Sequence, residues 1–453
     1  MEINGVVLDY SRDALFDELG IIRLKESYML PEEVSPQERF AKVSSMFSSN
    51  PEHAQRLYDY SSKHWLSYST PILSFGRSKN GLPISCFLNF IEDTSAGLVD
   101  NLSETNWLSM MGGGVGIGFG IRSSGDKSTG VMPHLKIYDA SSLAYRQGST
   151  RRGSYAAYLS IDHPDIISFL EMRKPTGDQN MRALNMHHGI NIPDAFMEII
   201  EKSMLDPEFD DSWELRDPHS KELREIVSAK SLWQQIIELR MQTGEPYLLF
   251  IDQANKEMHP AQKELGLSIK QSNLCSEIIE PTSVDRTAVC CLSSLNLEYY
   301  DDWKNDENYI PDVAEMLDNV LQYFIDNAPD TIARASFSAL RERSIGIGAL
   351  GFHALLQKRN LPWESALATG LNKTAFKHIR SEIERSQRML VVERGEPEDL
   401  ISSIEFEFED GLPVQVKSSD FIVVLRDGVE LTIRAFDVVE SDEFVSLSLE
   451  GRK

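Results

Sequence analysis

The sequence SNLCSE at residues 272–277, with VCCLSSLNL at residues 289–297, holds three of the four cysteines of this 453-residue chain. Residues 288–295, which overlap this second segment, are a strand-like apolar run, which predicts a buried strand. In SNLCSE the residues Asn273, Cys275 and Glu277 alternate, so in an extended segment their side chains would share one face. Burying Glu277 without a partner would be costly. The segment is therefore either a chemical site or a loop whose polar side chains are solvated.

Outward from these two segments, short apolar runs alternate with helical patterns. Runs such as 84–90 and 247–251 predict buried strands, and residues from about 12 to 66 read as short helices punctuated by prolines. Further helices are predicted from residue 162 onward and over roughly 99–111, 194–205, 231–243, 311–327 and 372–394. This alternation indicates an α/β architecture.

The last part of the chain has a different texture. It contains strand-like runs joined by Asp-Gly pairs, such as IEFEFEDGLPVQV, and no convincing helix; Asp-Gly is a preferred hairpin turn. We therefore expect three regions, which are an N-terminal helical region at 1–68, a central α/β region at 69–400 and a β-rich tail at 401–453.

The overall composition is that of a soluble globular protein. The formal net charge is −25, which argues against binding of nucleic acids or anionic membranes, because these partners require a basic surface. Binding of a nucleotide is not excluded, because it requires only a local cluster of hydrogen-bond donors. No run approaches the length of a membrane span, and the first residues lack the apolar core of a secretory signal, so we expect a cytoplasmic location. Four cysteines without a CxxC pair argue against a disulfide scaffold and against a zinc site.

Three cysteine-bearing segments, GLPISCFLN (81–89), SNLCSE and VCCLSSLNL, resemble the large subunit of class I ribonucleotide reductase. In that family an NLCxE finger loop holds a radical cysteine and two strands hold a redox pair. The segments STPILSFG, GGGVGIGFGIR, YRQGSTRRG and MHHGINI follow in the order of the family, and the resemblance covers roughly residues 40–400. It implies that 69–400 is the first part of a ten-stranded α/β catalytic barrel with a finger loop.

The resemblance implies a role for each polar residue of the finger loop. Cys275 becomes a thiyl radical that abstracts the 3′ hydrogen of a ribonucleotide. Glu277 acts as general base on the 3′ hydroxyl, and Asn273 hydrogen-bonds the substrate and holds that geometry.

The remaining cysteines have a different implied chemistry. Cys86 supplies a proton as the 2′ hydroxyl leaves as water, and Cys86 and Cys290 then form a disulfide that an external dithiol resets. Adjacent residues of a strand point to opposite faces, so Cys291 is expected to be a packed bystander.

Other segments resemble nucleotide contacts of the family. The Gly-rich run at 112–122 could cradle phosphate through backbone amides, but glycines also permit close packing. YRQGSTRRG (145–153) is either a solvated basic loop or, by resemblance, the relay between effector and substrate base. The implied substrate contacts are Thr70 and Ser85, and the implied contacts to dNTP or ATP effectors are Asp93, Arg122 and Arg151.

The resemblance also implies partners. No cofactor or metal is expected on the chain itself, because the radical comes from a diiron-tyrosyl small subunit and thioredoxin or glutaredoxin resets the disulfide. Since the resemblance stops near Leu400 and no cysteine follows Cys291, we expect the N-terminal part of a split, phage-like large subunit. Its C-terminal half would be a second polypeptide, and the assembled subunit would dimerise, in the host cytoplasm if the source is a virus.

Two other interpretations remain open. The chain could be an inactive copy that only binds nucleotides, or it could belong to the adenosylcobalamin-dependent branch that shares the NLCxE pattern. The intact central positions favour a catalyst that reduces ribonucleotides, as diphosphates, only when assembled with its partners.

Overall fold

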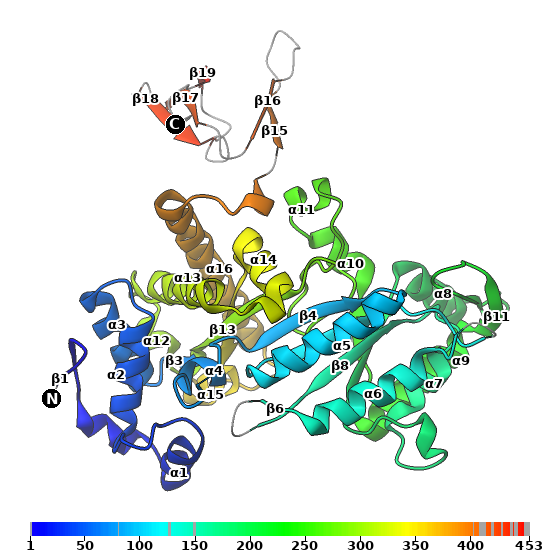
Figure 1. The fold of residues 1–453 in the computed structure, drawn as a ribbon. Coiled ribbons are helices and arrows are strands. Elements are labelled where there is room, and N and C mark those ends of the chain that lie inside the picture. Colours follow the sequence, from blue (N-terminus) through cyan, green and yellow to red (C-terminus); the bar gives the residue numbers. More distant parts are fainter. Residues whose placement is uncertain are drawn as a thin grey trace.

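The computed structural model describes residues 2–79, 81–125, 128–147 and 151–401 and, further along, Val438 and five short strands. A helical region, a central sheet flanked by helices and a group of short strands follow one another along the chain (Figure 1). One hydrophobic core runs through the helical region and the sheet. In the part of the chain that the structure describes, no helix is long and apolar enough to cross a membrane.

The N-terminal region forms short helices, as the sequence predicts. Its elements are β1 (Glu2–Ile3), β2 (Val6–Val7), η1 (Tyr10–Leu15), α1 (Glu18–Ser27), α2 (Pro36–Met46) and α3 (Pro51–Ser62). Prolines stand at the first position of α2 and α3, where a helix needs no N–H donor. The side chains of Ser35 and Asn50 cap these helices by accepting hydrogen bonds from the N–H groups of Gln37 and His53.

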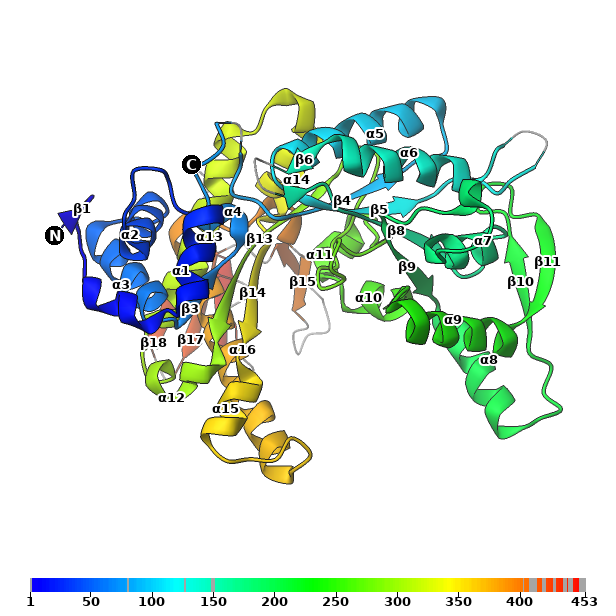
Figure 2. The same cartoon turned by 90° about the horizontal axis from the view of Figure 1, so that it is seen from below.

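The central sheet joins two sets of strands that run in opposite directions. The first set is parallel and contains β4 (Cys86–Ile91), β5 (Gly114–Phe119), β8 (Tyr155–Ser160), β9 (His187–Ile192) and β12 (Tyr247–Phe250). The second set, β13 (Ala288–Asn296) and β14 (Ile345–Leu350), is parallel within itself and antiparallel to β4. Strand β3 (Leu66–Tyr68) pairs with β13. The sheet curls from β12 to β14 (Figure 2), which confirms the predicted first part of an α/β barrel.

Helices and short turns connect the strands. The helices are α4 (Thr70–Leu73), α5 (Ser95–Met110), α6 (Val131–Ala144), α7 (Ile166–Leu170), α8 (Asp194–Leu205), α9 (Ala229–Thr243), α10 (Ile251–Glu257), α11 (Pro260–Glu264), α12 (Tyr300–Trp303), α13 (Tyr309–Asn327), α14 (Ala333–Glu342), α15 (Phe352–Lys358) and α16 (Ala366–Arg394). The 3-10 turns are η2 (Glu171–Arg173), η3 (Gln179–Met181), η4 (Leu297–Tyr299), η5 (Asp330–Ile332) and η6 (Glu398–Leu400). Two small hairpins pair β6 (Arg146–Gln147) with β7 (Arg151–Arg152) and β10 (Ser212–Arg216) with β11 (Leu223–Ser228).

Most predicted helices are confirmed, but three begin elsewhere, and one of these is α5, which begins at Ser95 instead of residue 99. The helix expected from residue 162 begins only at Ile166, because the Asp165 carboxylate accepts hydrogen bonds from the Val131 N–H and the Ser124 hydroxyl instead of capping a turn of its own. The helix expected from residue 372 begins already at Ala366, where the Ser365 hydroxyl caps it.

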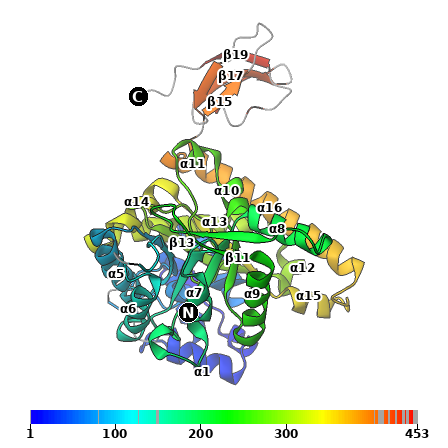
Figure 3. The same ribbon diagram turned by 90° about the vertical axis from the view of Figure 1, so that its right-hand side faces the viewer.

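The tail contains strands, as predicted. Strands β15 (Ser403–Phe406) and β16 (Val414–Lys417) form one hairpin, and β17 (Phe421–Arg426) pairs with β18 (Val429–Arg434) and β19 (Glu443–Leu447). In Figure 3 these strands lie beyond α11. The predicted Asp-Gly turns lie outside the described residues. Just before the tail, the buried Asp399 accepts hydrogen bonds from Arg286 at 2.5 Å and Arg341 at 2.7 Å.

Candidate active site

Two cysteines meet where the two strand sets join. Cys86 begins β4, Cys290 lies in β13, and the antiparallel register places the two residues directly opposite each other. Directly opposed residues point to the same face with Cα atoms about 4.5–5.5 Å apart, and a disulfide needs roughly 4.4–6.8 Å. Both thiols are buried and reduced. The structure therefore brings together the two cysteines that the family resemblance pairs.

A pocket of about 530 Å³ opens beside this cysteine pair. The Cys86 thiol lies 3.9 Å from Glu277 Oε1 and 3.4 Å from Ser85 Oγ. The pocket gathers residues from α4, from the finger loop, and from or beside strands β4, β5, β7, β8 and β13. They are Ser69, Thr70, Pro71, Ser85, Cys86, Gly114, Arg152, Ser154, Leu274, Cys275, Glu277 and Leu292. Both predicted substrate contacts, Thr70 and Ser85, thus share one pocket with the radical cysteine and the general base of the resemblance.

The finger loop reaches this pocket by a turn. Ser276 has a φ of 67°, in the left-handed region, and its N–H donates to the Asn273 carbonyl at 3.3 Å. Asn273 is completely buried, and its Oδ1 accepts the N–H groups of Glu277 and Ile278 at 3.0 and 3.1 Å. The prediction of an extended segment with one shared face is therefore wrong. Asn273 lies inside the turn, while Cys275 and Glu277 are exposed at the pocket.

The glycine-rich run makes room for the finger loop. It forms the buried strand β5, on which a Cβ at Gly116 would lie 2.1 Å from the Ser272 carbonyl oxygen. A Cβ at Gly114 would lie 2.5 Å from the Leu274 side chain. Because β5 is paired with β4 and β8 along its length, its amides serve the sheet. The close-packing interpretation is confirmed, and the phosphate cradle is not.

A hydrogen bond from β8 also holds the finger loop. The buried Tyr158 donates its hydroxyl to the Asn273 carbonyl at 2.7 Å. A buried carbonyl without a donor would cost about 1–3 kcal/mol, so this bond helps to fix the turn. The sequence held no signal for this contact, since 115 residues separate the two partners.

Burial keeps the paired thiols protonated. It raises the pKa of Cys86 to about 11 and the pKa of Cys290 well above its ordinary value, and nearby anionic groups act in the same direction. Such thiols can donate a proton or a hydrogen atom, whereas a nucleophile would need the thiolate. Cys291 points to the other face, as predicted, and its thiol donates to the Leu317 carbonyl of α13 at 3.2 Å.

Sequence reasoning missed one cation of the pocket. It selected Arg151, whose side chain lies outside the described part of the structure, whereas the neighbouring Arg152 lines the pocket. Arg152 is exposed and forms no ion pair with any described residue, so its guanidinium is available to an anionic ligand. The three arginines of YRQGSTRRG have the same chemistry, so the sequence alone does not tell which of them lines the pocket.

The two other predicted effector contacts lie at the opposite end of the strands. Asp93 follows β4 and Arg122 follows β5, and Arg122 Nε lies 2.5 Å from Asp93 Oδ2. The structure therefore brings these two residues together, at the carboxyl ends of strands whose amino ends carry the cysteine pocket. Neither residue lines that pocket.

One group among the described residues has ligand atoms close enough to hold a metal ion, and it lies between α3 and α13. It consists of His53, Asp312 and Glu315. The Asp312 carboxylate already accepts hydrogen bonds from Arg56 and Tyr60, and His53 Nε2 bonds the Asp312 carbonyl at 3.0 Å. These contacts link the helical region to the sheet.

Comparison with known protein families gives two adjoining matches. Residues 84–399 match the family described as "Ribonucleotide reductase, barrel domain", and residues 14–81 match "Ribonucleotide reductase, all-alpha domain". Both matches end before the β-rich tail.

Individual relatives agree with these families. The ribonucleoside-diphosphate reductase large subunit of Invertebrate iridescent virus 3 is 48% identical over 446 residues, covering 88% of this chain and 71% of that protein. The putative large subunit of Frog virus 3 (isolate Goorha) is 51% identical, covering 77% and 61%. The large subunit of Trypanosoma brucei brucei is 32% identical, covering 82% and 48%.

A solved structure shares the fold. The alpha subunit of the class Id ribonucleotide reductase of Actinobacillus ureae superimposes with a TM-score of 0.73 at 30% identity, covering 87% of this chain and 71% of that one. The chain thus spans about half to 71% of the length of these four relatives.

Proposed function

The chain belongs to the ribonucleotide reductase large-subunit family, and we propose that its cysteine pocket reduces ribonucleotides, as diphosphates, by thiyl-radical chemistry. The observation that carries the proposal is the direct opposition of Cys86 and Cys290 in the sheet, beside a loop that presents Cys275 and Glu277. Cys86, a candidate hydrogen-abstracting thiol and a base thereby line one pocket, and Cys290 lies directly opposite Cys86 in the sheet.

The finger loop performs the first steps. A Cys275 thiyl radical abstracts the 3′ hydrogen of the substrate, while Glu277 accepts the proton of the 3′ hydroxyl. Asn273 Nδ2 is buried and, apart from an interaction with the Cys86 thiol, has no hydrogen-bond partner among the described residues. Because an unpaired buried donor is costly, the substrate is a suitable partner for this amide.

The cysteine pair then supplies the electrons. Cys86, protonated because it is buried, gives its proton to the departing 2′ hydroxyl, which leaves as water. Cys86 and Cys290 together lose two protons and two electrons as the S–S bond forms. One proton leaves in the water, and the ribose carbon takes up the other proton and the two electrons. An external dithiol restores both thiols by exchange, and Cys275 takes back the 3′ hydrogen.

The remaining pocket residues hold the nucleotide. Thr70 and Ser85 offer hydroxyl groups beside Cys86, and Arg152 offers a guanidinium for phosphate. Asp93, Arg122 and Arg151 are proposed to contact the effector nucleotide.

We further propose that the pocket works only within a larger assembly. Among the described strands β14 pairs with β13 alone, so one edge of the sheet lacks a hydrogen-bonded neighbour. A second polypeptide with the rest of the barrel would pair with this edge. A small subunit would supply the radical, and thioredoxin or glutaredoxin would reduce the disulfide. Two assembled subunits would form a dimer.

Reconstitution tests this proposal. We expect CDP reduction when the full chain is mixed with a C-terminal half and a diiron small subunit, and loss of reduction with Cys275→Ser. Turnover by the chain alone would contradict the split assembly. Nucleotide binding without turnover in any mixture would favour the inactive copy, and stimulation by adenosylcobalamin would favour the other branch of the family.

A further inference from the structure

A second cavity lies at the base of the finger loop, away from the cysteine pocket. The loop runs along β5, with Gln271 against Gly118 and Leu274 against Gly114, so its base lies at the carboxyl end of that strand. There a cavity of about 270 Å³ opens among the ends of β4, β5, β8 and β9, which we call the base cavity. Ligands of parallel α/β sheets bind preferentially at the carboxyl ends of the strands.

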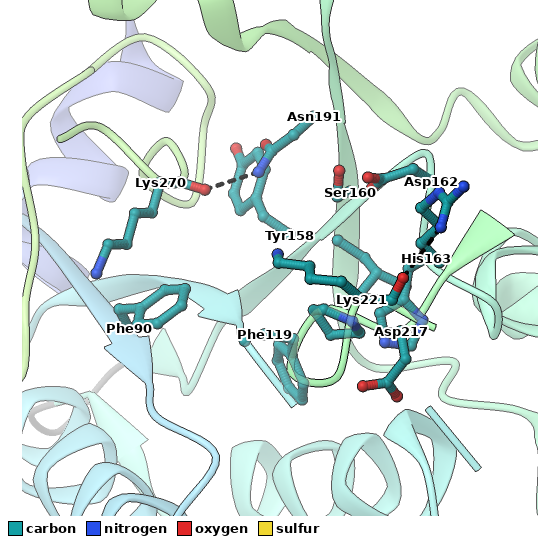
Figure 4. Close-up of a pocket in the computed structure, with 14 residues that line it drawn as sticks. Phe90, Phe119, Tyr158, Ser160, Asp162, His163, Asn191, Asp217, Lys221 and Lys270 are labelled. Carbon is teal, nitrogen blue, oxygen red and sulfur yellow. Dashed lines mark hydrogen bonds between the residues drawn. The ribbon is translucent and has the colours of Figure 1, made fainter. Parts of the chain in front are cut away.

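Two lysines face the base cavity, and the nearby Glu92 carboxylate acts to raise the pKa of one of them, Lys270. In Figure 4 the Lys221 ammonium reaches between Tyr158 and Phe119, and Lys270 lies on the opposite side above Phe90. Neither lysine forms an ion pair with any described residue. The Lys270 ammonium lies 4.1 Å from the centre of the Phe90 ring, and burial lowers its pKa, so part of its hydration is already lost.

Two other charged groups of the base cavity already have partners within the chain. Asp217 accepts hydrogen bonds from the backbone N–H groups of Ser123, His219 and Ser220, so its carboxylate anchors the loop. Arg216, also in the lining, is paired with the exposed Glu214 outside it.

Two acceptors of the base cavity lack donors. Among the described residues the half-buried Asp162 carboxylate forms no hydrogen bond or ion pair, and the Asn191 Oδ1 atom is buried without a partner. A buried acceptor without a donor is unfavourable. A ligand that satisfies the base cavity would therefore carry an anion for the lysines and hydroxyl donors for these acceptors.

We propose that the base cavity binds a small phosphate ester with free hydroxyl groups, of the size of a pentose phosphate. The phosphate lies between Lys221 and Lys270, a hydroxyl donates to Asn191 Oδ1, and the apolar face of the sugar packs against Phe90 and Phe119. The site is distinct from the cysteine pocket and requires no turnover.

Occupancy of the base cavity would act on the finger loop directly. Asn191 donates from Nδ2 to the Lys270 carbonyl at 2.7 Å, immediately before the loop. Tyr158 lines the base cavity, and its hydroxyl holds the Asn273 carbonyl within the loop. A ligand that orders these two side chains would restrain the loop that carries Cys275.

Calorimetric titration of the full chain tests the site with three probes. Ribose 5-phosphate carries both the anion and the hydroxyl donors, inorganic phosphate carries the anion alone, and ribose carries the donors alone. We expect ribose 5-phosphate to bind at least tenfold more tightly than either fragment. We expect the double variant Lys221→Gln/Lys270→Gln to weaken this binding at least tenfold, whereas Lys230→Gln, an exposed lysine of α9, leaves it unchanged.

A further variant distinguishes the two cavities. If Arg152→Gln abolishes ribose 5-phosphate binding and the double-lysine variant does not, the probe occupies the cysteine pocket and the proposal is wrong. Absence of binding at millimolar probe also overturns it.

Alkylation of Cys275 by iodoacetamide tests the link to the finger loop. The rate should fall at least twofold with saturating ribose 5-phosphate in the wild-type chain and stay constant in the double-lysine variant. An unchanged rate in the wild type with bound probe would refute the link, and thermal unfolding checks that each variant is folded.

Discussion

Gly116→Ala tests whether strand β5 sets the position of the finger loop. The new Cβ would lie 2.1 Å from the Ser272 carbonyl oxygen and 2.6 Å from Asn273 Cα, whereas real Cβ contacts stay above 3.0 Å. The loop must therefore retreat by roughly 0.9 Å. Overpacking of this kind costs about 1–3 kcal/mol of stability, and a displacement near 1 Å in a reacting constellation lowers the rate by about 100-fold.

The assay combines CDP reduction by the assembled enzyme with urea unfolding of the variant chain. Gly370→Ala is the matched control, because Gly370 in α16 has open space around its Cβ position, and alanine in a helix is favoured by roughly 1 kcal/mol. We expect this control to retain full activity and equal or higher stability. Gly116→Ala with kcat within twofold of wild type and an unchanged unfolding midpoint would refute the close packing of loop on strand.

Three further predictions concern the finger loop, the adjacent cysteines and a buried carboxyl group. Tyr158→Phe removes the donor to the Asn273 carbonyl, so we expect the free energy of unfolding to fall by about 1–3 kcal/mol. We also expect a lower kcat with little change in KM, and an unaltered kcat would show that this hydrogen bond does not position the loop. Cys291→Ala should retain activity within twofold and lose about 1 kcal/mol of stability, whereas Cys290→Ala should abolish multiple turnover; equal loss of activity in both variants would contradict their separate roles. Burial raises the pKa of Glu342 to about 8, so its contribution to stability is fully present below its ordinary pKa of 4.5 and is lost as the pH rises toward 8. Urea unfolding between pH 5 and 8.5 should show this loss of unfolding free energy in the wild type and a smaller loss in Glu342→Gln. An equal change of unfolding free energy with pH in both proteins would contradict the role of Glu342.

The sequence predicted the elements of the fold because their signals are local. The helix at 194–205 has the bounds that its apolar spacing indicates, and β13 covers the predicted apolar run. Strand direction was not predictable in this way. The antiparallel junction of β4 and β13, which sets Cys86 against Cys290, joins residues far apart in the sequence; only the resemblance paired them.

The details of the pocket depended on contacts that residue spacing does not report. Alternation in SNLCSE suggested one shared face, but the left-handed Ser276 turns the chain and places Asn273 inside. The glycine-rich run suggested a phosphate loop, yet the Cβ position of Gly116 is filled by the finger loop itself. Arg152 lines the pocket, and neighbouring arginines in one loop give no signal in the sequence that would select it.

The proposed reductant is the pair of Cys86 and Cys290. It is tested by a single turnover of the assembled enzyme with CDP and no external dithiol, followed by alkylation and peptide mass spectrometry. We expect dCDP to form in step with a Cys86–Cys290 disulfide, while Cys291 remains an unoxidised thiol. Formation of dCDP while both Cys86 and Cys290 remain reduced, or a disulfide that contains Cys291, would show that this pair is not the reductant.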